Sequence, residues 1–476
     1  MSEERERITG LAVVIMAAGK GTRLKSKRAK VLHEVGGKPL LGHVISAVSE
    51  VVAPEHIYVV IGHEAERVRA AMAGTGVRFV EQREQRGTGH AIECAREAVA
   101  GYENVLVLSG DAPLIQPETI LAVWRIHQAE GAAMTLLTAE PDEPLNYGRI
   151  IRVTPDSPEV MGIVEQKSLT PEQLPLREVN MGMYAFRSAP LFAHLNELGT
   201  NNAHGELYLT DMAGILYAAG ERVVAYKTSE FAELLGANTI AELVALDATL
   251  RAGTAARLMA AGVTILKPET TVIDAEVEVG SDTVIEPYVQ LLGRTKIGAD
   301  CTIRSYTVVE NCTLGEDVLV RQSCVLEGST VANGARIGPF AHLRPGSEVG
   351  EDAHVGNFVE TKNARLGKGV KAGHLTYLGD ADVGEGTNVG AGVITCNYDG
   401  VTKHRTRIGK DVFVGSDSTL VAPVSVEDGS YIGAGSCITK DVPAGSLTVA
   451  RAHQVTKEGW AAARRAKRAA KTEPRA

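Results

Sequence analysis

Residues 408–438 read IGKDVFVGSDSTLVAPVSVEDGSYIGAGSCI, and an aliphatic residue returns at every sixth position of this stretch. The aliphatic positions are Ile408, Val414, Leu420, Val426, Ile432 and Ile438. The same spacing occurs at residues 279–309 and 337–355. A period of six fits neither an α-helix nor a β-hairpin. It is typical of a parallel β-helix, in which each short strand buries one aliphatic side chain and neighbouring coils stack to form a core.

The repeat is interrupted in two ways. Its register slips by one residue at four places, which suits corners between strands. The slips lie between Val309 and Leu314, Leu326 and Val331, Thr361 and Leu366, and Leu378 and Val383. Between Cys396 and Ile408 the repeat stops, and the sequence NYDGVTKHRTR at residues 397–407 predicts a loop that leaves the coil. Loops held on a rigid scaffold often carry function.

The N-terminal half alternates short apolar runs with helical patterns. We expect strands at residues 11–16, 56–61, 77–80 and 105–108, and helices at residues 39–51, 65–72 and 89–99. This alternation predicts an open, mostly parallel α/β sheet of the Rossmann-like kind, where ligands bind at the carboxyl ends of strands. Residues 238–261 carry Ala and Leu at helical spacing, which predicts one linking helix. We therefore expect domains at residues 1–237 and 263–476, a linker at 238–262, and a basic tail from Arg464.

Composition supports two different domains in a reducing compartment. The 476 residues exceed what one core usually serves, and the 50 glycines and 4% aromatic content suit a thin β-helix. The net charge of −9 gives no reason to expect a nucleic-acid partner. The six cysteines lack metal-binding spacing, so we expect packed thiols. We find no apolar run typical of a signal peptide or a membrane span, and we therefore expect a cytoplasmic protein without membrane contact.

A small-residue loop follows the first expected strand. Residues 17–23 read AAGKGTR, and small residues allow backbone N–H groups to approach a phosphate. Arg23 and Lys30 could neutralise a triphosphate. The loop matches neither the Walker spacing nor the GxGxxG fingerprint. The alternative is an ordinary glycine turn with two solvated cations.

A carboxylate follows another expected strand. The sequence Leu108-Ser109-Gly110-Asp111 places Asp111 at the end of a buried apolar run. Such a carboxylate suits Mg²⁺, which prefers hard oxygen ligands and bridges substrate phosphates. A helix-capping role is the alternative interpretation.

Further motifs are distributed over most of the chain. The N-terminal half contains MAAGKGTR (16–23), KVLH (30–33), QREQRGTGHA (82–91), GD (110–111), YGRI (147–150), VE (164–165), NMG (180–182) and GAN (236–238). The C-terminal half contains LRPG (343–346), VGNFVETK (355–362), KAGHLTYLGD (371–380), NYDG (397–400), VGSD (414–417) and KEGW (457–460). Together they resemble the family of bifunctional N-acetylglucosamine-1-phosphate uridyltransferases/glucosamine-1-phosphate acetyltransferases, over about residues 11–460.

The resemblance implies two reactions on two domains. Glucosamine 1-phosphate would be acetylated from acetyl-CoA on a left-handed parallel β-helix. The product would then react with UTP, with Mg²⁺, to give UDP-N-acetylglucosamine and pyrophosphate for cell-envelope synthesis. The family also implies a homotrimer with acetyl-CoA sites at subunit boundaries.

The resemblance also implies the residues of the uridyltransferase site. They are Met16, Ala17, Ala18, Gly19, Arg23, Lys30, Gln82, Gly87, Thr88, Ser109, Gly110, Asp111, Gly148, Glu165, Asn180 and Asn238. Of these, Arg23 and Lys30 would act on the phosphates, and Asp111 and Asn238 would coordinate Mg²⁺. Gly87 and Thr88 would contact the uracil end. Gly148, Glu165 and Asn180 would hold the amino sugar.

For the acetyltransferase, the resemblance implies that His374 is the general base. A histidine with an ordinary pKa of ~6.5 suits the removal of a proton from an amine near neutral pH. Arg344, Lys362, Tyr377 and Asn388 would bind the sugar phosphate. The acetyl-CoA set would be Ala391, Asn397, Tyr398, Ser416, Ala434 and Arg451.

Three interpretations differ in what the β-helix does. The chain could be the two-site enzyme, a nucleotidyltransferase whose β-helix only regulates or oligomerises, or a noncatalytic scaffold. The presence of His374, Asn397, Tyr398 and Ser416 favours the first over the second, since a structural coil does not need that set. His342, His354 and His374 could also suggest a zinc site, but their neighbours favour a phosphate pocket instead.

Overall fold

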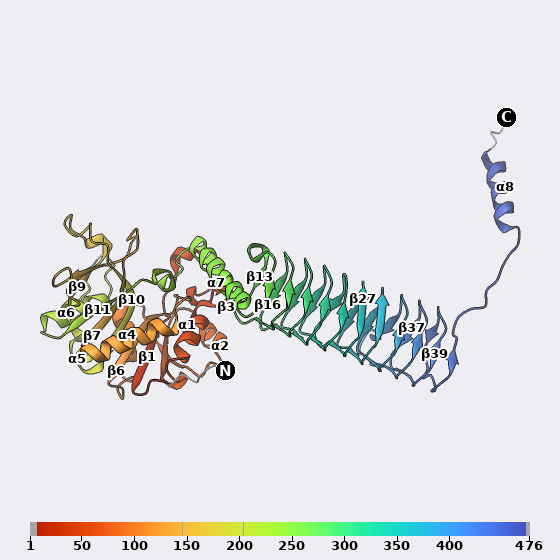
Figure 1. Cartoon of the computed structure of the whole chain (residues 1–476), viewed down its shortest axis with the longest axis horizontal. Coiled ribbons are helices and arrows are strands. Elements are labelled where there is room, and N and C mark those ends of the chain that lie inside the picture. Colours follow the sequence, from red (N-terminus) through yellow and green to blue (C-terminus); the bar gives the residue numbers. More distant parts are fainter. Residues whose placement is uncertain (1–6, 145, 203, 473–476) are drawn as a thin grey trace. The chain divides into compact units, whose positions relative to one another are not determined.

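The computed structural model describes residues 7–144, 146–202 and 204–472, with only the backbone at residues 470–472. The chain divides into two compact units, and the boundary lies between Thr254 and Ala255. This boundary falls within α7 (Ile240–Ala260), a helix in the segment where the Ala and Leu pattern predicts one (Figure 1). The limits of the two expected domains, at residues 237 and 263, stay a prediction.

The first unit is an α/β domain. Its strands are β1 (Leu11–Met16), β2 (Glu34–Val35), β3 (Lys38–Pro39), β4 (Ile57–Ile61), β5 (Arg78–Glu81), β6 (Asn104–Ser109), β7 (Met134–Ala139), β8 (Arg149–Arg152), β9 (Val160–Val164), β10 (Val179–Arg187) and β11 (Val223–Thr228). Its helices are α1 (Leu40–Ser49), α2 (Ala65–Ala71), α3 (Thr88–Ala95), α4 (Pro117–Glu130), α5 (Ser188–His194) and α6 (Met212–Ala218). The expected strands and helices are present, although α3 ends four residues before the expected Val99.

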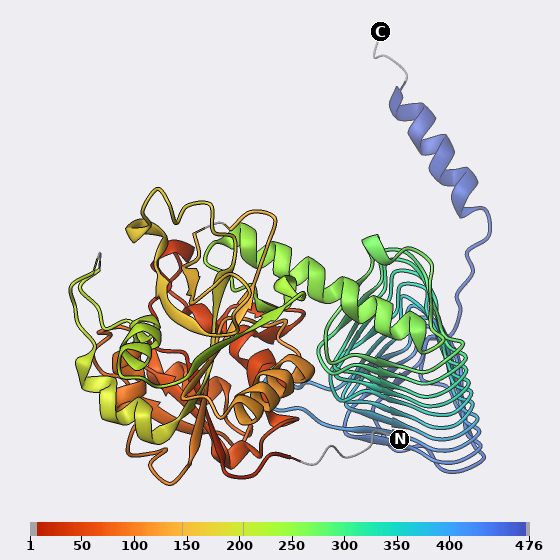
Figure 2. The same cartoon turned by 60° about the vertical axis from the view of Figure 1, so that its left-hand side comes forward.

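The main sheet has the order β11-β7-β10-β6-β1-β4-β5. Only β10 runs antiparallel within this path, so the expected mostly parallel sheet is confirmed. Alternate residues of β1 enter different cores. Val13 and Ile15 pack with residues of α1 and α4, whereas Ala12 and Val14 pack with residues of α3 and α6. Helices therefore cover both faces of the sheet (Figure 2).

The second unit is a three-sided parallel β-helix (Figure 2). Within the described residues its first sheet has 11 strands, its second 10 and its third 9. The first sheet runs from β12 (Thr264–Ile265) to β41 (Leu447–Thr448), the second from β13 (Val272–Ile273) to β40 (Cys437–Ile438), and the third from β14 (Glu278–Val279) to β38 (Val424–Val426). From β12 to β40, consecutive strands of the chain belong to consecutive sheets, as a coil with three strands per turn requires.

The hexapeptide residues form the core of this β-helix. All six aliphatic positions from Ile408 to Ile438 are at most 3% exposed, as the period predicts. Val279 is the exception and is only partly buried. Polar residues between the aliphatic positions also point inward, where their hydroxyl groups donate to backbone carbonyls of the next coil. Thr387 Oγ1, for example, lies 2.7 Å from the carbonyl oxygen of Gly409.

All six cysteines are free thiols. Cys301, Cys312 and Cys324 are buried in the β-helix, as expected. The expectation of packed thiols is wrong for Cys437, which is exposed. The physical reason is its position at the start of β40, where the side chain alternates with buried Ile438 and points outward.

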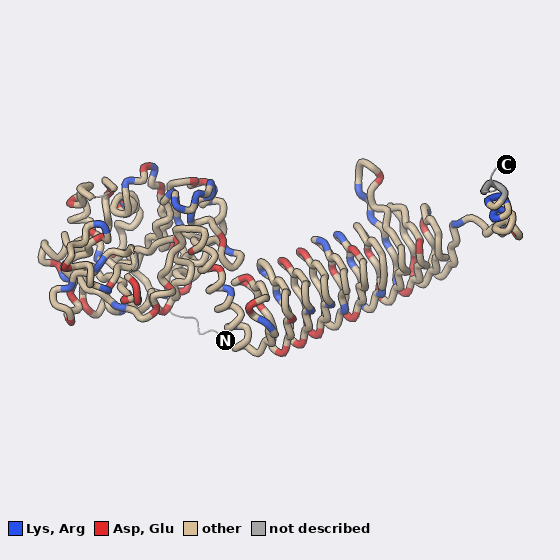
Figure 3. Tube along the Cα trace, turned by 90° about the horizontal axis from the view of Figure 1, so that it is seen from above, with Lys and Arg blue, Asp and Glu red and all other residues tan. Residues whose placement is uncertain are grey.

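All four register slips lie at one corner of the coil, which we call the second corner because it joins the second and third sheets. The slip after Val309, for example, separates β19 (Val308–Glu310) from β20 (Thr313–Leu314). The expected loop leaves the same corner, between β34 (Ile394–Cys396) and β35 (Thr406–Ile408). One loop stands out from the otherwise even coils in Figure 3.

In the part of the chain that the structure describes, no helix combines the length and apolar character needed to cross a bilayer. The basic tail carries a further helix, α8 (Trp460–Thr472). Residues 473–476 of that tail lie outside the described part.

One histidine of the first unit is buried without a catalytic neighbour. His127 on α4 is 1% exposed, and its ring nitrogens lie 2.9 Å from Thr135 Oγ1 and 3.3 Å from Asn104 Oδ1. Burial, together with the nearby Arg187, lowers the pKa of His127 to about 4. The folded protein therefore holds this ring neutral at a pH where the unfolded chain binds a proton.

This arrangement predicts a loss of stability in mild acid. An unfolded histidine has a pKa of ~6.5, so between pH 6.5 and 5 protonation of His127 favours the unfolded state by about 2 kcal/mol. The His127→Gln variant has no group that titrates at this position. The difference in free energy of unfolding between wild type and this variant should therefore shrink as the pH falls. Urea unfolding followed by Trp124 fluorescence, in a Trp460→Phe background, measures this. If that difference stayed constant between pH 7 and 5, the lowered pKa of His127 would be contradicted.

Candidate functional site

The first candidate site begins where β1 and β6 end side by side. Met16 and Ser109 are register partners, so the loop after β1 and the Asp111 turn start from adjacent positions. The Gly110 N–H donates to the Met16 carbonyl oxygen at 3.0 Å, which fixes the two loops together. A cavity lies at the carboxyl ends of these two strands, which is where we expect ligands to bind.

This cavity, which we call the phosphate cavity, measures about 480 Å³. It brings together most of the expected nucleotide residues, namely Met16, Ala17, Ala18, Gly19, Lys30, Gln82, Gly87, Thr88, Ser109 and Asp111. At one end the Gln82 side chain donates to the Gly87 carbonyl oxygen at 3.0 Å, and Thr88 Oγ1 accepts from the Leu209 N–H at 2.9 Å. These hydrogen bonds hold residues 82–88 in place as one wall of the phosphate cavity.

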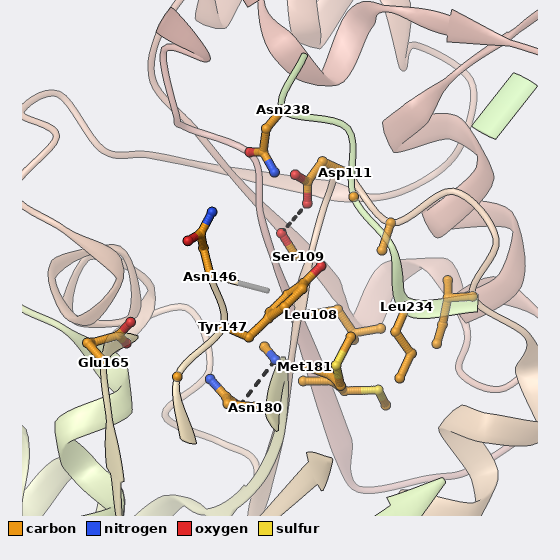
Figure 4. A pocket seen from close by; sticks show the side chains of 16 residues that line it. Leu108, Ser109, Asp111, Asn146, Tyr147, Glu165, Asn180, Met181, Leu234 and Asn238 are labelled. Atoms are coloured by element: carbon orange, nitrogen blue, oxygen red, sulfur yellow. Dashed lines mark hydrogen bonds between the residues drawn. The ribbon is translucent and has the colours of Figure 1, made fainter. Parts of the chain in front are cut away.

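A cluster of charges lies beside the phosphate cavity. Lys30 Nζ forms an ion pair with Asp111 and donates to Asn238 Oδ1 at 2.8 Å. Arg23 Nη2 donates to the same oxygen at 2.7 Å. Asp111 also accepts a hydrogen bond from the Ser109 hydroxyl, and Figure 4 shows Asp111 and Asn238 next to each other. The two side-chain oxygens therefore converge on one cation, the Lys30 ammonium group.

These two oxygens fit the magnesium ion that the resemblance implies. A carboxylate and an amide carbonyl are hard ligands, and Mg²⁺ commonly takes one or two protein oxygens and completes its shell with phosphates and water. Across the described ranges, no group of three or more His, Cys, Asp and Glu side chains is arranged to hold a metal. The zinc site considered for His342, His354 and His374 is therefore not formed.

Two glycines are required for this close packing. A Cβ atom on Gly236 would lie 2.8 Å from Asp111 Oδ2. Gly21 has a φ of +60°, and a Cβ atom there would lie 2.7 Å from Lys30 Cβ. Larger residues at these positions would push the carboxylate or the lysine away, so there is a steric reason for Gly236 of the GAN motif and Gly21 of AAGKGTR.

A second cavity of about 280 Å³ shares Ser109 and Asp111 with the first (Figure 4). We call it the sugar cavity, and it contains the three residues expected for the amino sugar, Gly148, Glu165 and Asn180. The Asn180 N–H donates to the Gly148 carbonyl oxygen at 2.9 Å. Burial raises the pKa of the Glu165 carboxyl, even though Thr210 Oγ1 donates to it at 3.3 Å.

The second candidate site lies on the β-helix, at the corner between its first and second sheets, which we call the first corner. Asn357 and His374 are register partners there, at the ends of β27 (His354–Asn357) and β30 (Lys371–His374). The same corner position in the following coils is taken by Ala391, Ser416 and Ala434, and backbone hydrogen bonds join these coils. The expected base and three expected acetyl-CoA residues therefore form one column. Arg451 joins its end by donating to the Ala434 carbonyl oxygen at 2.9 Å.

The His374 ring is exposed and has one close polar contact, in which Nδ1 lies 2.5 Å from Asn357 Oδ1. Asn357 belongs to the motif VGNFVETK, but the sequence did not identify it as a site residue. Its contact with His374 arises because the two residues are 17 positions apart, which is one turn of the coil.

Cations gather on the second sheet. Lys362 ends β28 (Glu360–Lys362), and Lys403 from the loop at residues 397–405 lies beside it. Lys403 and then Arg344 lower the pKa of Lys362, as expected where like charges crowd together. Lys403 is a residue that sequence reasoning missed. The signal that could have found it is the basic run KHRTR in the loop.

The other expected residues lie on the first and second sheets and at the second corner. Tyr377 begins β31 (Tyr377–Gly379) on the second sheet, whereas Asn388 begins β33 (Asn388–Val389) on the first sheet. Asn397 is anchored at the base of the loop, where Nδ2 donates to Asp380 Oδ2 at 2.5 Å. Tyr398 is exposed. A corner is convex, so Tyr377 and Asn388 lie on different faces of the coil.

Comparison with known proteins agrees with this architecture. Residues 13–200 match the MobA-like NTP transferase domain, residues 268–356 the GMPPB C-terminal domain, and residues 405–440 the hexapeptide repeat of succinyl-transferase. Both the nucleotidyltransferase fold and the hexapeptide β-helix are thereby confirmed.

Relatives match along nearly the whole chain. "Bifunctional protein GlmU" of Koribacter versatilis is 59% identical over 96% of this chain and 97% of its own length. Proteins of the same name from Solibacter usitatus and Shouchella clausii are 48% and 46% identical, over 96% and 95% of this chain and 97% and 99% of their own lengths. The chain therefore belongs to the bifunctional GlmU family, the family that its motifs resemble.

Proposed function

We propose that this chain makes UDP-N-acetylglucosamine in two reactions at two sites. The β-helix acetylates glucosamine 1-phosphate with acetyl-CoA, and the α/β domain then transfers a uridylyl group from UTP to the product and releases pyrophosphate. One observation carries the proposal, namely that the chain contains two separate clusters of functional residues. In the first, Lys30 lies between Asp111 and Asn238. In the second, His374 lies at the first corner of the β-helix, beside Asn357. The product would serve cell-envelope synthesis.

The uridylyl transfer needs charge neutralisation rather than a base. The second pKa of a phosphate monoester is ~6, so the sugar phosphate is already mostly dianionic near neutral pH. Arg23 and Lys30 would bind the UTP phosphates, while the sugar cavity holds the acceptor in line with the α-phosphorus. Asp111 and Asn238 would hold Mg²⁺, which when bound adds further positive charge against the phosphates. Lys30 would then leave the two oxygens and turn to a phosphate.

The acetyl transfer needs a base. The amine of glucosamine 1-phosphate is partly protonated near neutral pH, and His374 would accept its proton. The freed nitrogen attacks the thioester carbonyl carbon, a C–N bond forms and the C–S bond breaks. A second proton from the nitrogen passes to the leaving sulfur, so that CoA departs as a thiol. Arg344, Lys362 and Lys403 would bind the sugar phosphate together with Tyr377 and Asn388. Asn397, Tyr398 and the column from Ala391 to Arg451 would hold acetyl-CoA.

We also propose a homotrimer, because the second site lies on a convex corner of a single chain. The first corner carries an exposed apolar column that consists of Tyr288, Tyr306, Phe340, Phe358 and Leu375, each between 48% and 63% exposed. Tyr288 and Tyr306 stack with ring centroids 5.1 Å apart, and Phe340 and Phe358 stack at 5.4 Å. Such a patch suits burial against another subunit, which would also enclose His374. The co-substrates UTP and acetyl-CoA, and the free thiols, favour a cytoplasmic location.

The two activities should depend on different residues, and Asp111→Ala tests the first. Loss of the carboxylate removes a magnesium ligand and the ion-pair partner of Lys30, so we expect uridylyl transfer to fall at least about 10³-fold. Acetyl transfer should stay within twofold of wild type. Asp156→Ala removes an exposed carboxylate of the same unit and serves as the control. Normal UDP-sugar formation by the Asp111 variant would refute the assignment of this residue.

The variant His374→Ala tests the second activity. Removal of the base should reduce acetyl transfer about 10²- to 10⁴-fold and leave uridylyl transfer from N-acetylglucosamine 1-phosphate unchanged. Assays with glucosamine 1-phosphate, acetyl-CoA, UTP and Mg²⁺, with each omitted in turn, separate the two steps. Full acetyl transfer by this variant would favour a β-helix base elsewhere. Absence of acetyl transfer in wild type would favour the alternative, a nucleotidyltransferase with a noncatalytic β-helix.

Substitutions at Tyr288 and Tyr306, the part of the exposed apolar column that lies furthest from His374, test the proposed trimer. The double variant Tyr288→Glu/Tyr306→Glu places charge in the proposed interface, so its mass in sedimentation should fall from three chains to one. Acetyl transfer should fall with it, while uridylyl transfer persists. Thr330→Glu, on the polar third sheet, is the control. An unchanged mass for the double variant would rule out this corner as the interface.

A further inference from the structure

One side-chain contact at the first corner joins Asn357 to His374. The two residues are register partners on adjacent coils, and the Leu375 N–H donates to the Asn357 carbonyl oxygen at 3.0 Å. The side chains therefore leave the corner side by side, and Asn357 Oδ1 lies 2.5 Å from His374 Nδ1. The coil register, rather than a flexible approach, sets this pairing.

The chemistry of the contact selects one form of the imidazole ring. An amide oxygen accepts hydrogen bonds and does not donate them. The partner nitrogen Nδ1 must therefore carry the ring proton, and Nε2 keeps the lone pair. A general base needs that lone pair directed at the substrate.

The next coil leaves room on the other side of the ring. The column position that follows His374 is Ala391, a methyl side chain, and Ser416 comes after it. Small residues there would allow a thioester to lie beside Nε2. The two ring nitrogens therefore have different surroundings. Nδ1 faces the amide of Asn357 on the preceding coil, and Nε2 is free of that contact.

His354 is a titratable group near the ring. Burial, then Arg321, His374 and Lys371, lowers the pKa of His354. Glu360 of the neighbouring sheet is paired with Arg344 at 2.9 Å. In the part of the chain that the structure describes, no carboxylate is recorded in contact with His374, so the orienting role falls to the neutral amide.

We propose that Asn357 is a positioning residue of the acetyltransferase, which holds His374 with the proton on Nδ1 and Nε2 free to act as the base. This inference rests on the proposed role of His374 as that base. Asn357 itself does not touch the reacting atoms.

Three variants of Asn357 test the proposal in the full-length protein. Asn357→Ala removes the acceptor, and we expect kcat for acetyl transfer to fall about tenfold, which corresponds to ~1.4 kcal/mol. KM for glucosamine 1-phosphate and acetyl-CoA should stay within about twofold, because the binding groups are untouched. Asn357→Asp keeps an acceptor and should restore kcat to within about threefold of wild type at pH 8.5. Asn357→Leu, of similar size without an acceptor, should behave like the alanine variant.

The pH profile separates positioning from a purely structural role. A carboxylate at position 357 stabilises the imidazolium form, so the acidic limb of kcat/KM for Asn357→Asp should move to higher pH by about one unit. Asn333→Ala removes a corner amide that bonds to the Glu316 N–H at 2.9 Å, and it controls for general loss of corner hydrogen bonds. Its acetyl transfer should match wild type, and uridylyl transfer should be unchanged in all these variants.

Two results would overturn the proposal. The first is full kcat in both the alanine and leucine variants. The second is an unshifted acidic limb in Asn357→Asp. Either result would leave the role of His374 intact if His374→Ala still lacks acetyl transfer, whereas normal acetylation by His374→Ala would remove the proposed base itself.

Discussion

The β-helix depends on one constraint, the burial of one aliphatic side chain per strand inside a narrow three-sided coil. The residues from Ile408 to Ile438 satisfy it at every sixth position and are almost completely buried. Because stacked coils share continuous backbone ladders, this constraint also fixes which residues lie above one another at the corners. Asn357, His374 and Ala391 are neighbours for that reason, and the proposed acetyltransferase is therefore a consequence of core register.

The α/β domain positions its site by a different route. Strands β1 and β6 end in register, so two loops start from the same edge of the sheet and bring Lys30 and Asp111 together. Asn238 approaches from the start of the segment that leads into α7, and Gly236 leaves space for the carboxylate. Here the sheet fixes where the loops begin, while steric clearance at single glycines decides how closely the charges meet.

The sequence was sufficient to predict periodic features. The hexapeptide spacing predicted the coils, and apolar runs such as residues 11–16 predicted the sheet. It also predicted Asp111 at the end of a strand. It did not reveal that Lys30 lies between Asp111 and Asn238, because those residues are far apart in the chain and meet only through the fold. Asn357 was missed for the same reason, whereas the basic run KHRTR could have identified Lys403. The prediction that Cys437 is packed was wrong, because the short repeat does not distinguish inward from outward positions at strand ends.

The second corner has a consequence for how such a chain can change its length. Four one-residue deletions and one seven-residue insertion, relative to the perfect repeat, all occur there between residues 309 and 408, while the strands on either side keep their partners. This edge thus tolerates added or removed residues without disturbing the core. Replacement loops grafted between Cys396 and Thr406 would give a route to acyl acceptors of other shapes on an unchanged scaffold.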